Sequence, residues 1–235
     1  MRIVLIGYGV MGKLIQTLAE EKGHQIAAVI DQDEASLSAQ ELAAKLVGCD
    51  VAIDFTTAKA VRRNIEACLA AGVPLVEGTT GWNKDRDGIE QLVGDGGGAF
   101  VFGANFSIGV NLFYRIVDFA SEQFAKFPEY EAFIEDQNHS RKKDSPSGTA
   151  LKLKEVVSRH IEKDLSVSAT RAGNIPGTHS VGFDGPADQI LLEHMARSRE
   201  GFASGAILAA EWIVGKKGFY EFTDVIDEII RAGVH

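Results

Sequence analysis

The sequence predicts an α/β protein in which a parallel, doubly wound sheet forms one domain and an inserted α+β domain carries a mixed sheet. Three observations predict this fold class. Residues 1–107 alternate short apolar runs with helical patterns, the order that produces a parallel sheet. After Ser107 the alternation stops, and a long helix precedes several strand patterns. Two apolar helical patterns at the end are expected to return to the first domain, so we predict domains of residues 1–107 plus 200–235 and of residues 108–199.

The composition is that of a globular protein with a hydrophobic core. Of the 235 residues, 45% are hydrophobic and 24% are charged. The formal net charge of -9 argues against nucleic acid or an anionic membrane as the main partner. No apolar run approaches the ~18 residues of a membrane span, and Cys49 and Cys68 match neither a disulfide framework nor a metal site. We therefore expect a cytoplasmic protein that uses no metal.

A glycine-rich turn follows the first strand. Arg2–Ile6 is a strand that is apolar from its second residue onwards, and a G-x-G-x-x-G pattern opens the next helix with Gly7, Tyr8, Gly9, Val10, Met11 and Gly12. A second strand, Gln25–Ile30, ends at Asp31. The glycines allow a pyrophosphate to approach the helix N-terminus, and the acid is placed to bind the adenosine ribose. The full context predicts a Rossmann-type dinucleotide site; the alternative is a glycine-rich turn beside a solvated aspartate.

The residue types at the end of the second strand favour NADH over NADPH. The negative charge of Asp31 repels a 2′-phosphate, and the next residue is Gln32 rather than an arginine. The nearest cation is Lys13. NADH is therefore the favoured cofactor, with NADPH as the alternative.

The rest of the first domain continues the alternation of strands and helices. We expect strands at Asp50–Phe55, Pro74–Glu77 and Ala99–Gly103, and helices within Glu34–Val47, Val61–Ala71 and Asp85–Val93. In such sheets ligands bind beyond the carboxyl ends of the strands. The loops at these ends predict further cofactor contacts from Phe55, Thr56, Gly78, Thr79, Thr80, Ala104, Asn105 and Phe106. Each loop alone is compatible with an ordinary turn.

The second domain reads as helices and a mixed sheet. We expect a long helix at Ile108–Phe127, a helix after Thr149, strands near Tyr130–Ile134, Val167–Arg171, His179–Phe183 and Gln189–His194, and final helices at Ala203–Val214 and Thr223–Ala232.

The stretch from Ile134 to Ala150 combines cations with an anion-binding turn. His139, Arg141, Lys142 and Lys143 fall within five residues, and Pro146-Ser147-Gly148-Thr149 precedes a helical pattern. The free N–H groups at a helix start suit a carboxylate or phosphate. The alternative is an exposed basic loop with an ordinary N-cap at Ser147 or Thr149.

Seven motifs spread over the chain belong together. They are VLIGYGVMGK, VAIDFTT, EGTTG, ANFSIGVN, KKDSPSGTA, RAGNIPGTH from Arg171 to His179, and REGFASGA near Arg199. With them, nearly the whole chain resembles the dihydrodipicolinate reductases (4-hydroxy-tetrahydrodipicolinate reductases) of bacterial lysine biosynthesis. The K-x-D-x-P-S-G-T-A run is close to diagnostic of that family.

The resemblance implies a fold and a reaction. Residues 1–107 plus 200–235 would bind the dinucleotide, and residues 108–199 would bind substrate and form a homotetramer through the sheets. A nicotinamide hydride would pass to C4 of a cyclic imine dicarboxylate, and protonation of the neighbouring carbon would give tetrahydrodipicolinate in diaminopimelate synthesis.

The resemblance also implies residue roles. Ser147, Gly148 and Thr149 match the turn that binds a substrate carboxylate, and Lys142 matches the family lysine. The family usually has two adjacent histidines; the second is His139, but the first falls on Asn138. Because an amide cannot exchange a proton at neutral pH, the proton would come from His139, Lys142 or bound water while Asn138 orients substrate. The alternative is a catalytically impaired paralogue that binds dinucleotide.

The remaining histidines receive weaker assignments. His179 matches a family position beside the substrate domain. The other four are expected to be structural or at the surface: His24, His160, His194 and His235.

Overall fold

The computed structural model describes residues 1–233, which form two compact units. The first comprises Met1–Ile108 with the segment from Phe202 onwards, and the second comprises Gly109–Gly201. Each unit has its own sheet and its own hydrophobic core. His235, which was expected to be structural or at the surface, lies outside the described residues.

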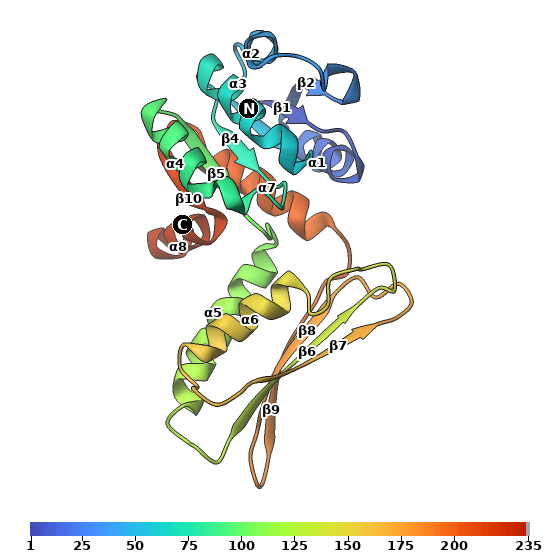
Figure 1. The fold of residues 1–235 in the computed structure, drawn as a ribbon, viewed down its shortest axis with the longest axis vertical. Coiled ribbons are helices and arrows are strands. Elements are labelled where there is room, and N and C mark those ends of the chain that lie inside the picture. Colours follow the sequence, from blue (N-terminus) through green and yellow to red (C-terminus); the bar gives the residue numbers. More distant parts are fainter. Residues whose placement is uncertain (234–235) are drawn as a thin grey trace. The chain divides into compact units, whose positions relative to one another are not determined.

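The first unit is built on a six-stranded parallel sheet (Figure 1). Its strands are β1 (Arg2–Ile6), β2 (Gln25–Ile30), β3 (Val51–Asp54), β4 (Leu75–Glu77), β5 (Ala99–Phe102) and β10 (Gly218–Glu221). The spatial order is β10-β5-β4-β3-β1-β2, so the direction of winding reverses between β1 and β3. This parallel sheet confirms the predicted α/β domain.

Helices cover both faces of this sheet and form two cores. On one face lie α1 (Val10–Glu21), α7 (Glu200–Ile213) and α8 (Phe222–Ala232); on the other lie α2 (Ala39–Leu46), α3 (Ala58–Ala71) and α4 (Arg86–Asp95). Two short 3₁₀-helices are η1 (Gln32–Glu34) and η2 (Asn83–Asp85). In β1, Ile3 and Leu5 enter the first core while Val4 and Ile6 enter the second. A strand buried on both faces must be apolar at every buried position, which explains the run of four apolar residues after the exposed Arg2.

The second unit is a four-stranded mixed sheet with two helices on one face. The elements are α5 (Ile108–Phe124), β6 (Glu131–Asn138), α6 (Gly148–Ser158), β7 (Ser166–Arg171), β8 (Thr178–Asp184) and β9 (Gln189–Met195). The order is β7-β6-β8-β9, with β6 parallel to β7 and β8 antiparallel to both neighbours. α5 and α6 pack on Ile134, Val181 and Phe183, which confirms the predicted α+β character.

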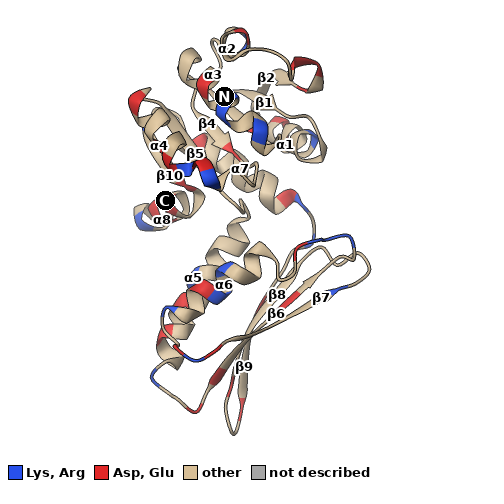
Figure 2. Ribbon diagram, in the orientation of Figure 1, with Lys and Arg blue, Asp and Glu red and all other residues tan. Residues whose placement is uncertain are grey.

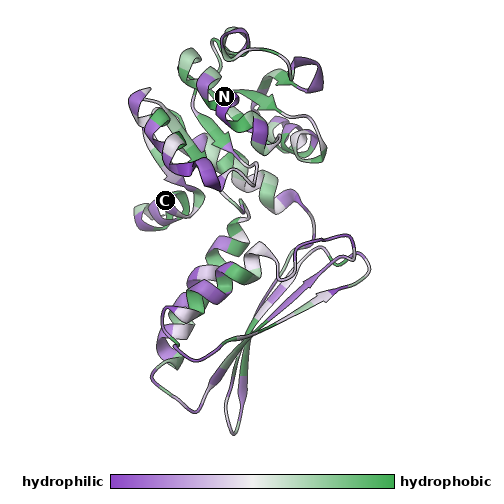
Figure 3. Ribbon diagram, in the orientation of Figure 1, coloured by the Kyte–Doolittle hydropathy of each residue, from purple (hydrophilic) through white to green (hydrophobic). Residues whose placement is uncertain are grey.

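The two sheets differ in polarity along their strands. Figure 3 shows mostly hydrophobic strands in the first unit and a mixture of hydrophilic and hydrophobic positions along the strands of the second. This is the difference expected between a sheet covered on both faces and one covered on a single face. The outward positions of β9 include Leu191 and Met195, which are 49% and 59% exposed.

The structure differs most from the sequence prediction at two element bounds and at one strand that was not predicted. The strand expected to end at Ile134 continues to Asn138, and the long helix ends at Phe124 instead of Phe127. β10 was not predicted at all. Cys68 is buried and Cys49 is half-buried, and both thiols are free.

Candidate active site

The glycine turn after β1 brings the backbone close to the loop after β3. Gly7 has a φ of +89°, and a Cβ at this position would collide with the Phe55 carbonyl group. A Cβ at Gly12 would collide with the Gly7 carbonyl oxygen. Both positions therefore require glycine, one for its conformation and both for close packing. The turn lies where the winding of the sheet reverses, which is the usual ligand site of such sheets.

The other side of the turn is open and suited to a dinucleotide. A Cβ at Gly9 would meet nothing within 4 Å, and Gly9 caps α1 without a side-chain hydrogen bond. The first N–H groups of α1 can therefore face a pyrophosphate. Asp31 is exposed at the end of β2, and its Oδ1 accepts the Tyr8 N–H at 3.4 Å. These residues fit the predicted cofactor.

The loops after β3 and β4 are tied to each other. The Thr56 N–H donates to Thr79 Oγ1 at 3.0 Å, and Trp82 Nε1 donates to the Thr79 carbonyl oxygen at 2.8 Å. The Phe55 ring lies so close to Gly78 that no side chain fits there. Thr80 is exposed beside them. The structure thus brings together two of the three loops that the sequence assigns to the cofactor.

The third predicted loop, after β5, is partly committed to the core. Asn105 Oδ1 accepts the Ser107 N–H at 2.9 Å, and Ala104 is exposed. Phe106 is only 2% exposed and packs on Phe222, with ring centroids 4.7 Å apart. Its side chain is therefore a core residue, and a cofactor contact from this position would have to come from the main chain.

In the second unit, the buried carboxylate of Asp136 joins four elements or loops. Its Oδ2 accepts Arg171 Nη2 of β7 and the Ser147 N–H, both at 2.7 Å. Its Oδ1 accepts Asn138 Nδ2 at 2.6 Å and lies 3.2 Å from His179 Nε2 of β8. Asp136 itself is 0% exposed. One side chain thus fixes the end of β6, the start of α6 and both neighbouring strands.

No role for Asp136 or Arg171 was predicted from the sequence. The signal that identifies Asp136 is its spacing: Ile134, Asp136 and Asn138 continue the inward-facing period of two along β6. Arg171 is the register partner of Asn138, and its guanidinium also donates to the Asp144 carbonyl oxygen at 2.8 Å. The network therefore holds the basic loop as well as the strands.

The charges of this network follow from its contacts. Burial by itself raises the pKa of Asp136, but hydrogen bonds from Arg171 and Ser147 outweigh it, so the pKa of Asp136 lies below its usual value. Burial lowers the pKa of His179 to about 4 despite the opposing effect of Asp136. At neutral pH, Asp136 is therefore an anion and His179 is a neutral ring.

Ser147, His179 and Asp136 do not form a nucleophile triad. Ser147 Oγ lies 3.1 Å from His179 Nε2, and Asp136 Oδ1 lies 3.2 Å from the same nitrogen. A triad requires the acid and the nucleophile on opposite ring nitrogens. This arrangement can position groups but cannot activate the serine.

Asn138 and His139 have different surroundings although they are adjacent. Asn138 is 6% exposed, and its amide is held by Asp136. His139 is half-buried, and among residues 1–233 no hydrogen-bond partner meets its buried Nδ1. Of these two adjacent residues, only His139 has an imidazole that can exchange a proton.

The basic loop returns to the helix start at Ser147. Figure 2 shows Lys and Arg positions gathered in the loop after β6. Lys142 Nζ pairs with Asp144 at 2.9 Å, and this contact, together with a smaller effect of the Gly148 N–H, lowers the pKa of Asp144. An anion is thus already held beside the predicted carboxylate-binding turn.

Ser147 is the N-cap of α6. Its Oγ accepts the Ala150 N–H at 3.2 Å, while its own N–H is occupied by Asp136. The Ser147 N–H is therefore not available to another anion, and the turn continues with the exposed Gly148 and the half-buried Thr149.

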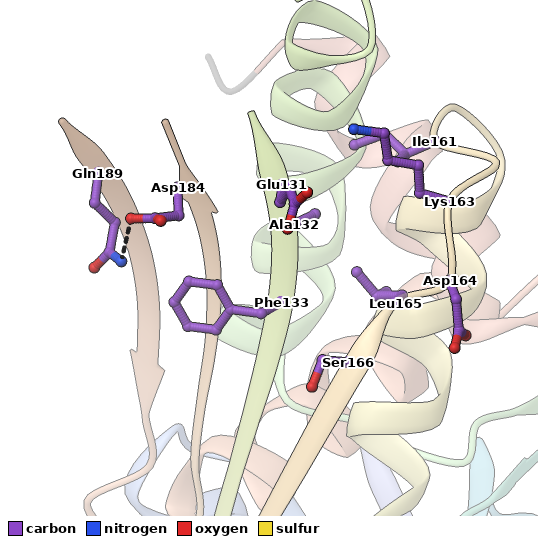
Figure 4. Close-up of a pocket in the computed structure, with 10 residues that line it drawn as sticks. All are labelled: Glu131, Ala132, Phe133, Ile161, Lys163, Asp164, Leu165, Ser166, Asp184 and Gln189. Atoms are coloured by element: carbon purple, nitrogen blue, oxygen red, sulfur yellow. Dashed lines mark hydrogen bonds between the residues drawn. The ribbon is translucent and has the colours of Figure 1, made fainter. Parts of the chain in front are cut away.

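A separate cavity of about 350 Å³ lies at the other end of β6 (Figure 4). Its lining includes Glu131, Phe133, Lys163 and Asp184 but none of the predicted site residues. The chemistry of this lining does not single out a ligand. Within the described part of the chain, no helix has the length and apolar character needed to cross a membrane, and no cluster of metal-ligating side chains occurs.

Comparisons with known proteins agree over nearly the full length of the chain. The family model described as dihydrodipicolinate reductase, N-terminus, matches residues 1–106, and its C-terminus counterpart matches residues 109–226. A 4-hydroxy-tetrahydrodipicolinate reductase from Christiangramia forsetii is 33% identical over 98% of this chain and 100% of its own length. The reductase of the same name from Archaeoglobus fulgidus is 36% identical, covering 97% of this chain and 100% of its own.

A solved structure shares the fold. The dipicolinate-bound dihydrodipicolinate reductase from Paenisporosarcina sp. TG-14 superimposes with a TM-score of 0.77 at 23% identity, covering 95% of this chain and 99% of that one. Fold and full-length similarity together define an NAD(P)H-dependent oxidoreductase of Rossmann type. The chain belongs to the dihydrodipicolinate reductase family.

Proposed function

We propose that the protein is a 4-hydroxy-tetrahydrodipicolinate reductase of diaminopimelate and lysine biosynthesis. One observation carries the proposal: Asp136 holds both ends of the basic loop, through Asn138 and Ser147, so that Lys142 and the start of α6 stay together. Cations beside a helix N-terminus suit a substrate with two carboxylates. Full-length similarity to curated reductases of this name supports the substrate class.

The two units would divide the work. Residues 1–107 plus 200–235 bind the dinucleotide, which supplies the hydride when bound, and residues 108–199 bind the dicarboxylate. Gly148 and Thr149 orient one carboxylate, and Lys142 offsets its charge by exchanging its exposed partner Asp144 for the substrate. His139, whose buried Nδ1 has no partner among the described residues, is the proposed proton donor.

NADH is the proposed cofactor because the cations near the ribose site have other partners. Lys45 of α2 pairs at 3.0 Å with Glu34, which lies three residues after Asp31. Arg63 donates to main-chain carbonyl groups of the same loop. Lys13 lies over the Tyr8 ring, 5.6 Å from its centroid. A 2′-phosphate at this position would therefore be repelled by Asp31 and Glu34, and the nearby cations are already engaged with other groups.

We also propose a homotetramer located in the cytoplasm. The uncovered face of the second sheet presents Leu191 and Met195 on β9, while Leu192 points into the core. Association through this face would bury that apolar surface. Light scattering would give four times the 25.3 kDa chain mass if the proposal holds, and a single chain mass would contradict it.

Steady-state oxidation of NADH, and separately of NADPH, tests the activity. The substrate is generated in place from pyruvate and aspartate semialdehyde by the preceding synthase. If the His139 imidazole supplies general acid catalysis, turnover should fall by about 10²–10⁴-fold in the His139→Ala variant. Lys142→Ala should raise KM for the dicarboxylate. The neighbouring, exposed Lys143→Ala is the matched control and should behave as the wild type.

Asn138 motivates one competing function, a paralogue that binds dinucleotide but has lost catalysis. The amide of this residue is fixed on Asp136 and cannot replace an imidazole in proton transfer. Absence of turnover in the wild type with restoration by Asn138→His would establish that function. Absence of turnover in every variant, despite NADH binding, would reject the reductase proposal and direct attention to other substrates.

A further inference from the structure

Two buried carboxyl groups lie directly before the predicted cofactor loops of the first unit. Asp54 is the last residue of β3, Glu77 is the last residue of β4, and the two are register partners. Both are 0% exposed. Central parallel strands are normally apolar, and acids are almost never fully buried without a partner. Two adjacent buried acids therefore require a specific interaction.

Each carboxyl group has one satisfied and one unsatisfied oxygen. Asp54 Oδ2 accepts Asn64 Nδ2 at 2.6 Å, and Glu77 Oε1 accepts the Thr79 N–H at 2.7 Å. Among residues 1–233, Asp54 Oδ1 and Glu77 Oε2 have no hydrogen-bond partner. A single proton between these two oxygens would satisfy both and would remove one of two like charges.

Among residues 1–233, no positively charged group appears among the contacts that shift the pKa of either acid. The strand neighbours are Ile6 beside Asp54 and Phe102 beside Glu77. On α3, the Arg63 guanidinium donates to Asn64 Oδ1 at 2.8 Å, so it reaches Asp54 only through the Asn64 amide. Also on α3, the Cys68 thiol has a raised pKa because of its burial and the two carboxyl groups, so it stays neutral.

We propose that Asp54 and Glu77 share one proton and that this pair positions the cofactor loops. Glu77 is the carboxylic acid, with Oε2 donating to Asp54 Oδ1. Its other oxygen holds the Thr79 N–H, and Thr79 Oγ1 in turn accepts the Thr56 N–H. The pair therefore sets the relative position of the loops after β3 and β4. The part that concerns NADH rests on the proposed function.

The direction of proton sharing agrees with the local electrostatics. Burial and then the neighbouring Asp54 raise the pKa of Glu77 well above its usual value. Burial also raises the pKa of Asp54, against the hydrogen bonds donated by Asn64 and Thr56. The residue with more donors keeps the negative charge, and the other keeps the proton.

Removal of the shared proton would weaken cofactor binding. At high pH both groups become anions in adjacent strands, and their repulsion pushes the strand ends apart. The Thr79 and Thr56 hydrogen bonds then lose their geometry. NADH binds more tightly to the protonated pair, so bound NADH raises the pKa of the pair. If the pKa rises by about one on binding, the deprotonated protein binds NADH about tenfold more weakly than the protonated protein.

The test measures the NADH dissociation constant by fluorescence from about pH 6 to about pH 10, because a carboxylic acid with a raised pKa loses its proton on the alkaline side of its usual range. The wild type should lose up to about tenfold in affinity. Glu77→Gln should bind like the wild type near neutrality and lose this pH dependence, because its amide still donates to Asp54 and accepts from Thr79. Glu90→Gln, which removes an exposed acid from α4, is the matched control and should retain the wild-type profile.

The outcomes separate the inference from the proposed function. Superimposable pH profiles for wild type and Glu77→Gln would overturn the inference. Failure of the wild type to bind NADH at any pH would reject the proposed cofactor instead, and the proton would still be visible in the infrared. The wild type should show the C=O band of a buried carboxylic acid at neutral pH that disappears at high pH. Absence of that band would also overturn the inference, even if Glu77→Gln does not fold.

Discussion

Asp54 and Asp136 are both 0% exposed aspartates, one in each unit, yet their pKa values shift in opposite directions. Asp136 is surrounded by donors, including the Arg171 guanidinium and the Ser147 N–H at 2.7 Å each. Asp54 has the amide of Asn64 on one side and a second acid, Glu77, on the other.

The difference shows that burial does not set the charge of an acid; its partners do. Desolvation opposes ionisation at both positions and is the largest single effect on each pKa. A guanidinium and several N–H donors overcome it in the second unit. The hydrogen bonds donated by Asn64 and Thr56 and the contact with the Glu77 carboxyl group do not overcome it in the first. The same side chain therefore anchors a fixed anion in one unit and part of a proton-sharing pair in the other.

The largest effect is expected from removal of the Asp136 carboxylate. Asp136→Ala should lower the free energy of unfolding by about 3–5 kcal/mol, because it leaves the half-buried Arg171 guanidinium without its anion and the Ser147 N–H without an acceptor. Urea denaturation followed by circular dichroism measures this loss. Asp136→Asn, which keeps the shape but not the charge, should lose less. A loss below about 1 kcal/mol for Asp136→Ala would mean that the network adds no net stability.

The next effect tests the weaker set of partners around Asp54. Asn64 is 0% exposed and donates to Asp54 Oδ2 at 2.6 Å. Asn64→Ala should destabilise the protein by about 1–3 kcal/mol, since it leaves a buried carboxylate oxygen without its donor. Asn83→Ala, at an exposed position in η2, is the control and should change stability little. Equal unfolding midpoints for the two variants would contradict the importance of this donor.

These two networks also mark the limit of what the sequence predicted. The glycine turn, the apolar central strands and the basic loop follow from local patterns of residue type and spacing. The inward position of the Asp136 side chain was not predicted, because the strand was expected to end where the polar residues begin. These polar side chains can face inward because their hydrogen-bond partners come from β7, β8 and the start of α6. Such partners are distant in sequence, and spacing alone cannot pair them.

The missing strand β10 has a similar explanation. Gly218–Glu221 is four residues long and half-buried, and it follows two lysines. It is a strand because it pairs with β5, with Gly218 beside Ala99. That pairing joins segments more than a hundred residues apart in the sequence, so no local sequence pattern predicts the strand. The sequence predicted the cofactor loops and the basic loop. The buried acids Asp54, Glu77 and Asp136, which hold these loops, were found only in the structure.

The dependence of stability on pH should separate the two acids. The pKa of Asp136 is lower in the folded protein, so its stabilisation is complete above the unfolded value of about 3.9 and is lost as pH falls through the folded value. The pKa of Glu77 is higher in the folded protein, so its stabilisation is complete below about 4.3 and is lost as pH rises through the folded value. A tenfold change in either acid dissociation constant on folding corresponds to about 1.4 kcal/mol.

Denaturation at a series of pH values checks this opposition. Asp136→Asn should flatten the acid side of the stability profile, and Glu77→Gln should flatten the neutral to alkaline side. If both variants flattened the same side, the two carboxyl groups would not differ as their contacts indicate.

The smallest effect concerns two helix caps, one in each unit. Ser147 caps α6 and Ser38 caps α2, and each Oγ accepts one main-chain N–H. Loss of such a cap costs about 1 kcal/mol. Ser147 is 2% exposed, and its Oγ also lies 3.1 Å from His179 Nε2, whereas Ser38 is exposed. Ser147→Ala should therefore destabilise the protein more than Ser38→Ala, because it also removes a neighbour of a buried ring nitrogen.

Thermal unfolding of the two alanine variants measures the difference, and Ser147→Thr, which keeps a hydroxyl, should restore most of the loss. Equal shifts in Tm for Ser147→Ala and Ser38→Ala would show that the contact with His179 adds nothing to the cap. A larger shift for Ser147→Ala would place this serine within the Asp136 network, so that the start of α6 is stabilised by the sheet as well as by its own cap.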